Sequence, residues 1–112
     1  SHITGGGIAA NIARVLPTQL AADVERGSWQ VPPVFDLIAS TGSVPIADME
    51  NTFNMGLGMV AVVANSAVSD ALSFLAALGL QSSVVGQVRQ REQNELGDAA
   101  AKGGKGGAVS LR

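Results

Sequence analysis

The chain has 112 residues, the length of one domain, and 46% of them are hydrophobic, so it can build a core. Its net charge of −2 argues against a nucleic-acid or anionic-membrane partner, because neither would find a basic surface. The absence of cysteine excludes disulfides and thiolate metal sites, and no apolar run is long enough to span a bilayer. We expect a soluble, cytoplasmic protein.

The first half of the chain predicts helices that alternate with a strand. Helically spaced apolar residues after three glycines predict a helix over 7–16. Residues 19–25 alternate loosely and predict a strand. A second helix is expected over 32–42, because prolines are tolerated in a first turn and a glycine ends the pattern. A short polar turn or helix follows at 46–51.

The second half continues this order. The valine-rich run 59–64 predicts a strand covered on both faces. Residues 69–78 predict a capped helix, and 82–90 predict another strand. The polar, glycine-rich segment 91–107 indicates a flexible loop, and 108–112 could return as a last short strand. The alternation predicts a single domain of the α+β class with α/β-type layers.

The glycine run Gly5, Gly6 and Gly7 is the first candidate site. Consecutive N–H groups at a helix start suit a phosphate, and glycine lets a ligand approach the backbone. The run matches neither the Walker pattern nor GxGxxG. Two interpretations therefore stay open: a cradle for an anion, or a tight turn where a strand becomes a helix.

Other polar residues near glycines are weaker candidates. His2 is the only histidine, and no partner that would make it a catalytic base can be identified. Asn11 could reach a ligand at the glycine run or act as a local hydrogen-bond donor. Gly56 and Gly58 would form a bare strip in an extended chain. Asn54, just before this strip, could meet the glycine run or serve a turn.

Charged residues give no clear site. Two carboxylate pairs have the i, i+2 spacing of a strand face, but neither has a third ligand, so we predict solvated surface and no metal: Asp23 with Glu25, and Asp48 with Glu50. Lys102 and Lys105 could touch a phosphate or only keep a loop soluble. Catalytic residues cannot be assigned from these patterns.

Three segments resemble, in order and spacing, the C-terminal domain of the phosphoribosylformylglycinamidine cyclo-ligases, or aminoimidazole ribonucleotide synthetases. They are HITGGGIAANIARVLP at 2–17, SWQVPPVF at 28–35 and TFNMGLGMVAVV at 52–63. The resemblance runs from residue 2 to about residue 90. It implies a partial three-layer α/β/α domain with its core in residues 2–90. Selenophosphate synthetase and formylglycinamidine synthetase share this architecture.

The resemblance implies that the complete enzyme uses ATP to close the imidazole ring of formylglycinamidine ribonucleotide, giving aminoimidazole ribonucleotide, ADP and phosphate. ATP and magnesium would be bound mainly by an N-terminal domain that this chain lacks, so we expect the chain alone to bind neither and to be inactive. Family members are homodimers with a small nucleotide substrate. The alternatives are another ATP-dependent enzyme of this superfamily, or a non-catalytic module that self-associates.

The resemblance also implies a substrate cleft between the two domains of the complete enzyme. The residues expected to line it are His2, Thr4, Gly5, Gly6, Gly7, Asn11, Asn54 and Gly56. Within this set, the glycine run is expected to lie near the ribose phosphate of the substrate.

Overall fold

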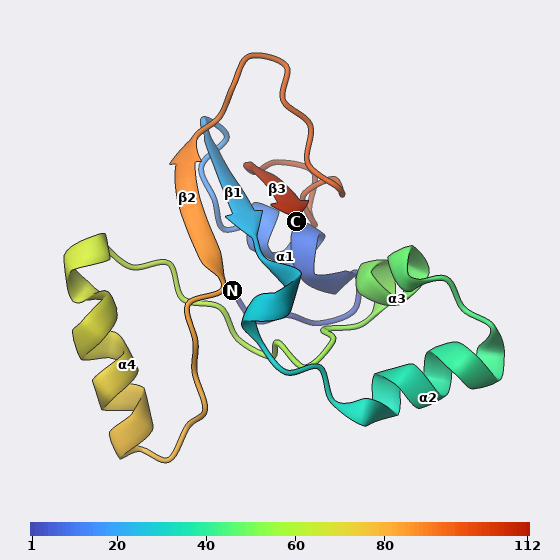
Figure 1. Ribbon diagram of the computed structural model, residues 1–112. Coiled ribbons are helices and arrows are strands. Elements are labelled where there is room, and N and C mark those ends of the chain that lie inside the picture. Colours follow the sequence, from blue (N-terminus) through green and yellow to red (C-terminus); the bar gives the residue numbers. More distant parts are fainter.

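The computed structural model describes residues 1–112 and contains four α-helices and three β-strands (Figure 1). In chain order they are α1 (Gly7–Ala13), β1 (Leu20–Val24), α2 (Pro33–Gly42), α3 (Ile46–Thr52), α4 (Val68–Ala77), β2 (Gly86–Gln90) and β3 (Ala108–Leu111). Two short 3₁₀ helices, η1 (Arg26–Ser28) and η2 (Asn65–Ala67), complete the list. Helices combined with a small sheet confirm the predicted α+β class.

The sheet is mixed and has the strand order β2-β1-β3. The central strand β1 pairs antiparallel with β2 and parallel with β3, so that Ala22 lies opposite both Val88 and Val109. Because side chains alternate along a strand, Ala22, Val24 and Val109 share one face. Helix α1 packs against this face.

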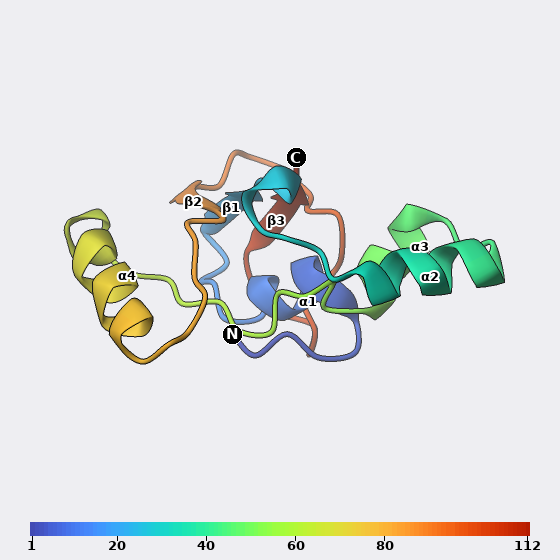
Figure 2. The same ribbon diagram turned by 60° about the horizontal axis from the view of Figure 1, so that its bottom comes forward.

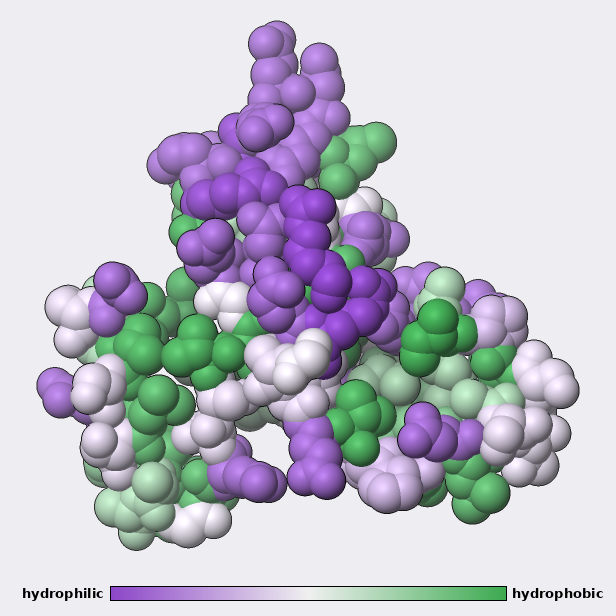
Figure 3. Space-filling view, in the orientation of Figure 1, coloured by the Kyte–Doolittle hydropathy of each residue, from purple (hydrophilic) through white to green (hydrophobic).

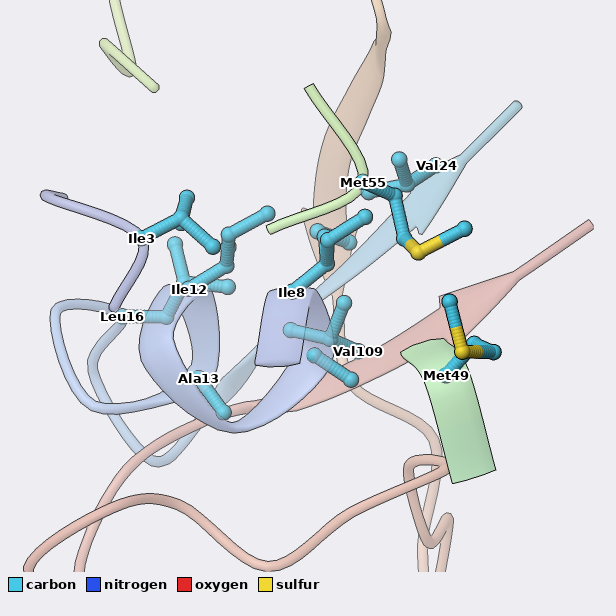
Figure 4. Packing of buried hydrophobic residues seen from close by; sticks show 11 residues of the cluster. Ile3, Ile8, Ile12, Ala13, Leu16, Val24, Met49, Met55 and Val109 are labelled. Atoms are coloured by element: carbon cyan, nitrogen blue, oxygen red, sulfur yellow. The ribbon is translucent and has the colours of Figure 1, made fainter. Parts of the chain in front are cut away.

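The core lies between α1, the sheet and α3 (Figure 4). Its buried members are Ile3, Ile8, Ala9, Ile12, Ala13, Leu16, Ala22, Val24, Met49, Met55 and Val109. Ile8 and Ile12 are four residues apart, so both side chains project from the same side of α1 toward the sheet. The helix forms here because its apolar residues follow the helical period.

Residues 59–64 do not form the buried strand that their composition predicts. Met59 makes a single antiparallel bridge with His2, and the rest of the run has no strand partner. Val62 and Val63 are 52% and 45% exposed. A strand needs a continuous neighbour for its backbone hydrogen bonds, but only Met59 and Val60 have one, in residues 1–2, and residues 61–64 have none. The prediction of a strand covered on both faces is therefore wrong for this structure.

Other helices and strands begin or end a few residues away from their predicted boundaries. Helix α1 ends at Ala13, after which turn hydrogen bonds carry the chain to Leu16. The predicted strand over 82–90 begins only at Gly86. In the glycine-rich segment, the Lys102 N–H donates to the Ala10 carbonyl at 3.0 Å, which holds the segment against α1. The flexibility of 91–107 stays a prediction.

The helices that follow β1 lie on opposite sides of the body (Figure 2). Helices α2 and α3 lie on one side, and α4 lies on the other, beyond β2. No helix has both the length and the apolar character needed to cross a membrane.

Candidate functional site

The glycine run and the segment that contains Asn54 are neighbours. The Ile3 N–H donates to the Gly58 carbonyl at 2.9 Å, and the Val60 N–H donates to the Ser1 carbonyl at 2.8 Å. This pairing brings two of the three sequence segments together. An open hollow of about 390 Å³ lies between them, lined by Ile3, Thr4, Gly5, Phe35, Thr52, Phe53 and Asn54.

The three glycines have different roles. Gly6 and Gly7 have φ angles of 97° and 76°, in the left-handed region that glycine favours. A Cβ atom on Gly7 would also overlap the backbone carbonyl of Glu50, where α1 meets α3. A Cβ atom on Gly5 would meet nothing within 4 Å. The fold therefore explains why positions 6 and 7 require glycine, but it gives no reason for the glycine at position 5.

Asn11 holds the glycine turn from inside the core. Its side chain is fully buried, and its Nδ2 donates to the carbonyls of Gly7 at 2.7 Å and Thr4 at 3.2 Å. Its Oδ1 accepts from the Thr4 hydroxyl at 3.3 Å. Of the two roles left open by the sequence, the structure shows the local hydrogen-bond role. Asn11 shapes the turn and does not line the hollow.

Lys102 brings a positive charge to the turn from the far end of the chain. Its Nζ donates to the Gly5 carbonyl at 2.7 Å and to the Thr4 hydroxyl at 3.1 Å. Its exposed ammonium thus lies at the rim of the hollow. The sequence offered only a lysine among glycines, and nothing in local spacing could show that it reaches residues 4 and 5.

Asn54 and Gly56 form a turn beside the hollow. The Asn54 Oδ1 accepts from the Gly56 N–H at 2.9 Å, and the Leu57 N–H donates to the Asn54 carbonyl at 2.8 Å. Met55 and Gly56 both have positive φ, as in a type I′ turn. Trp29 supports the turn by donating its Nε1–H to the Met55 carbonyl at 3.0 Å. Asn54 lines the hollow, whereas Gly56 lies outside it.

Two aromatic rings give the hollow an apolar wall. Phe35 of α2 and Phe53, which follows α3, pack with ring centroids 5.8 Å apart and planes tilted by 55°. Both come from the segments that carry the family resemblance. The hollow therefore combines an apolar wall with a polar rim formed by Thr4, Asn54 and the nearby Lys102.

His2 lies apart from this site. Its side chain is exposed, and its backbone carbonyl accepts a hydrogen bond from Arg14 at 3.3 Å. The residue bridges to Met59 and does not line the hollow. Of the residues predicted to line the cleft, the structure thus brings Thr4, Gly5 and Asn54 together around the hollow. Gly6, Gly7, Asn11 and Gly56 lie in the turns beside it, and His2 lies outside it.

The carboxylates are engaged with arginines away from the hollow. Asp23 pairs with Arg89 at 2.7 Å and Arg112 at 2.8 Å, and Arg89 also pairs with Glu95 at 2.6 Å. Hydrogen bonds from these guanidinium groups lower the pKa of Asp23 to about 2, and the bond from Arg89 lowers the pKa of Glu95 to about 2. Arg26 forms a two-point ion pair with Glu50, with N···O distances of 2.7 Å and 2.9 Å. No cluster of three potential metal ligands forms.

Residues 1–99 match the protein family described as AIR synthase related protein, C-terminal domain. The chain belongs to this family. A phosphoribosylformylglycinamidine cyclo-ligase of Bifidobacterium animalis is 46% identical over 100 residues, which are 89% of this chain and 29% of that protein. That of Myxococcus xanthus is 50% identical over 88 residues, 79% of this chain and 26% of that protein.

A Streptomyces fradiae protein that is provisionally named as the same cyclo-ligase is 47% identical over 102 residues. These residues are 90% of this chain and 56% of that protein. The chain thus spans about a quarter to just over half of the length of these relatives. The family resemblance drawn from the three sequence segments is confirmed. Lys102 lies outside the part of the chain that matches the AIR synthase related family.

Proposed function

We propose that this chain is the substrate-binding part of a phosphoribosylformylglycinamidine cyclo-ligase. In the complete enzyme, ATP would activate the formyl amide oxygen of formylglycinamidine ribonucleotide, and an amidine nitrogen would attack to close the imidazole ring. Aminoimidazole ribonucleotide, ADP and phosphate would leave. The family match and the relatives named as cyclo-ligases support this proposal.

The hollow beside the glycine run would bind the ribose phosphate end of the substrate. One observation carries this assignment: glycine at position 5 has no steric or conformational reason within the fold, yet it lines the hollow. A missing side chain there leaves the backbone open to a ligand. The Lys102 ammonium and the Thr4 hydroxyl at the rim can attract and bind phosphate oxygens.

The aromatic wall suits the rest of such a ligand. Phe35 and Phe53 offer apolar surface for a sugar ring or a flat base-like group, while Asn54 offers an amide on the opposite chain segment. Pockets for small ligands commonly combine such apolar walls with a few polar groups that fix orientation. In this proposal the chain binds and orients the substrate.

The residues of this chain do not fit magnesium. Asp23, Glu50 and Glu95 are bound to arginines, and no cluster of three potential ligands forms. We therefore place ATP and magnesium binding in the part of the enzyme outside these residues, together with the remaining layers of a three-layer α/β/α domain. A magnesium-dependent coupled assay on the isolated chain should show no ADP release. ADP release that depends on the substrate would contradict this expectation.

Titration with ribose 5-phosphate tests the binding role directly. We expect saturable amide NMR shifts at Gly5 and Gly6 in the native chain. Gly5→Ala should fold normally and bind more weakly, because its methyl group projects where the ligand approaches. Gly27→Ala is the matched control, since a Cβ atom there also meets nothing within 4 Å and Gly27 does not line the hollow. A dispersed spectrum without shifts at the glycines would refute the proposal.

A further inference from the structure

The segment between η1 and α2 contacts the turn that carries Asn54 at two points. The Trp29 Nε1–H donates to the Met55 carbonyl at 3.0 Å. The Pro32 ring lies so close to Gly56 that a Cβ atom on that glycine would overlap it. The position of the turn is therefore set by contacts from within this chain.

The backbone of the turn depends on such contacts. Met55 has a φ angle of 50°, in the left-handed region that residues with a side chain disfavour. A residue in this conformation persists where the surrounding structure holds it. The Trp29 hydrogen bond ends on the carbonyl of this same residue. Without it, Met55 would be freer to leave the left-handed region, and the adjacent Asn54 would move with it.

Apolar packing surrounds this hydrogen bond. Trp29, Val31, Phe53 and Leu57 are half-buried and pack against the core. Figure 3 shows hydrophobic residues around the start of α2, below the hydrophilic top of the body. A hydrogen bond in apolar surroundings is stronger than one in water, and removing one partner costs more. The indole N–H therefore holds the Met55 carbonyl in one place.

The turn also fixes which atom of the Asn54 amide is available to a ligand. The Gly56 N–H can only donate, so the amide atom 2.9 Å from it is the acceptor Oδ1. The Nδ2 atom makes no hydrogen bond within the chain. Asn54 lines the hollow together with Thr4 and Gly5. The amide thus has its N–H donors free for an acceptor such as a phosphate or sugar oxygen.

We propose that Trp29 is a positioning residue for substrate binding, whose indole N–H acts through the Met55 carbonyl to hold Asn54 so that Nδ2 donates to a ligand oxygen. This role rests on the proposed function, because the ligand is the one assigned to the hollow. Trp29 does not line the hollow itself, so it acts on the ligand only through the turn. The segment 28–35 then serves both parts of the site, since it also supplies Phe35 to the apolar wall.

Removal of the indole N–H tests this role. Trp29→Phe keeps an aromatic ring and should weaken ribose 5-phosphate binding about fivefold by isothermal titration calorimetry, the scale of one hydrogen bond. Ser28→Ala is the matched control, because it removes a side-chain hydrogen bond of the same segment that ends on the Glu25 carbonyl and not on the turn. It should bind like the native chain. Equal losses in the two variants would contradict the role of Trp29.

A double-variant cycle separates positioning from a general loss of structure. Asn54→Asp keeps an acceptor for the Gly56 N–H but has no N–H donor, so it should weaken binding by about tenfold. Adding Trp29→Phe should then cause no further loss, because the donor that Trp29 positions is already absent. A further loss of the same size as in the native background would overturn the proposal.

Amide hydrogen exchange tests the turn without any ligand. The Leu57 N–H donates to the Asn54 carbonyl at 2.8 Å, and Trp29→Phe should speed its exchange by about tenfold. The Lys102 N–H, which donates to the Ala10 carbonyl, is the control and should exchange at its native rate. If the native chain bound no ribose 5-phosphate, the proposed function would fail, whereas faster exchange at Leu57 would still show that Trp29 holds the turn. Unchanged exchange at Leu57 would refute the positioning role whatever the affinities.

Discussion

The ammonium group of Lys102 lies 2.7 Å from the carbonyl oxygen of Gly5, although the two residues are separated by most of the chain. The glycine run itself carries no charged side chain, so the positive charge that would attract a phosphate to this rim comes from Lys102. The contact therefore assigns the positive charge of the candidate site to a segment outside the family match.

Removal of this charge should weaken phosphate binding. Lys102→Ala should raise the dissociation constant for ribose 5-phosphate by about tenfold, the scale of one charge-assisted hydrogen bond. Isothermal titration calorimetry at low salt measures the change. Lys105→Ala is the matched control, because it removes a neighbouring lysine that makes no hydrogen bond with the turn, and it should change affinity far less. Equal losses in both variants would show that only the net charge matters.

The glycine turn should respond differently at each position. Gly7→Ala should lower the free energy of unfolding by at least about 2 kcal/mol, because the new Cβ atom overlaps the Glu50 carbonyl and the residue keeps a positive φ. Gly5→Ala should change it by less than about 0.5 kcal/mol. Urea denaturation of both variants provides the comparison. Similar losses at the two positions would contradict the roles that we assign to them.

The buried amide of Asn11 should be essential for stability. Asn11→Ala leaves the Gly7 carbonyl without this donor inside the core, which should cost about 1–3 kcal/mol. Thermal unfolding monitored by circular dichroism tests this. Asn65→Ala, at an exposed asparagine, serves as the control and should have little effect. A stable Asn11→Ala chain would mean that water or another group replaces the amide.

Acid should destabilise the fold through Asp23 and Glu95. Their pKa values are lowered to about 2 in the folded chain, from ordinary values of 3.8 and 4.5. The folded state therefore binds fewer protons than the unfolded state in this range, and its stability falls as the pH drops from about 4.5 toward 2. Above pH 5 this contribution is fully present.

Asp23→Asn should reduce this pH dependence to the part that comes from Glu95, because the variant has no carboxylate at position 23 to protonate. Chemical denaturation at several pH values between 2 and 6 measures the slope. Glu25→Gln, which removes a carboxylate without an arginine partner, should leave the slope almost unchanged. If Asp23→Asn kept the full slope, the pairs of Asp23 with Arg89 and Arg112 would not contribute to it.

Local patterns in the sequence predicted most of the helices, including α1 and α2, which lie next to the candidate site. The spacing of Ile8 and Ile12 identified α1, and the prolines before Val34 identified the start of α2. The run 59–64 was wrongly predicted as a buried strand, because its valines indicate burial but cannot supply the strand that would cover them. Composition indicates that a segment favours the strand conformation, but the strand forms only where a neighbouring segment completes its backbone hydrogen bonds.

The candidate site was predictable only in part. Glycine and asparagine residues marked the turns around Gly5 and Asn54, because these residue types tolerate unusual backbone angles. The contribution of Lys102 could not be predicted, since it depends on the pairing of β3 with β1, which brings the preceding loop back to α1. The role of Asn11 as a buried hydrogen-bond donor to the turn also could not be predicted, because it depends on tertiary packing.

The parallel pairing of β1 with β3 affects how the chain can fold during synthesis. Ala22 is made early, but its neighbour Val109 is made much later. Until then the apolar face of β1 lacks one of its two flanking strands and stays accessible to other proteins. Such distant pairings slow folding, and nascent chains with exposed strands are prone to aggregate. We expect production in cells to depend strongly on chaperones and on the rate of translation.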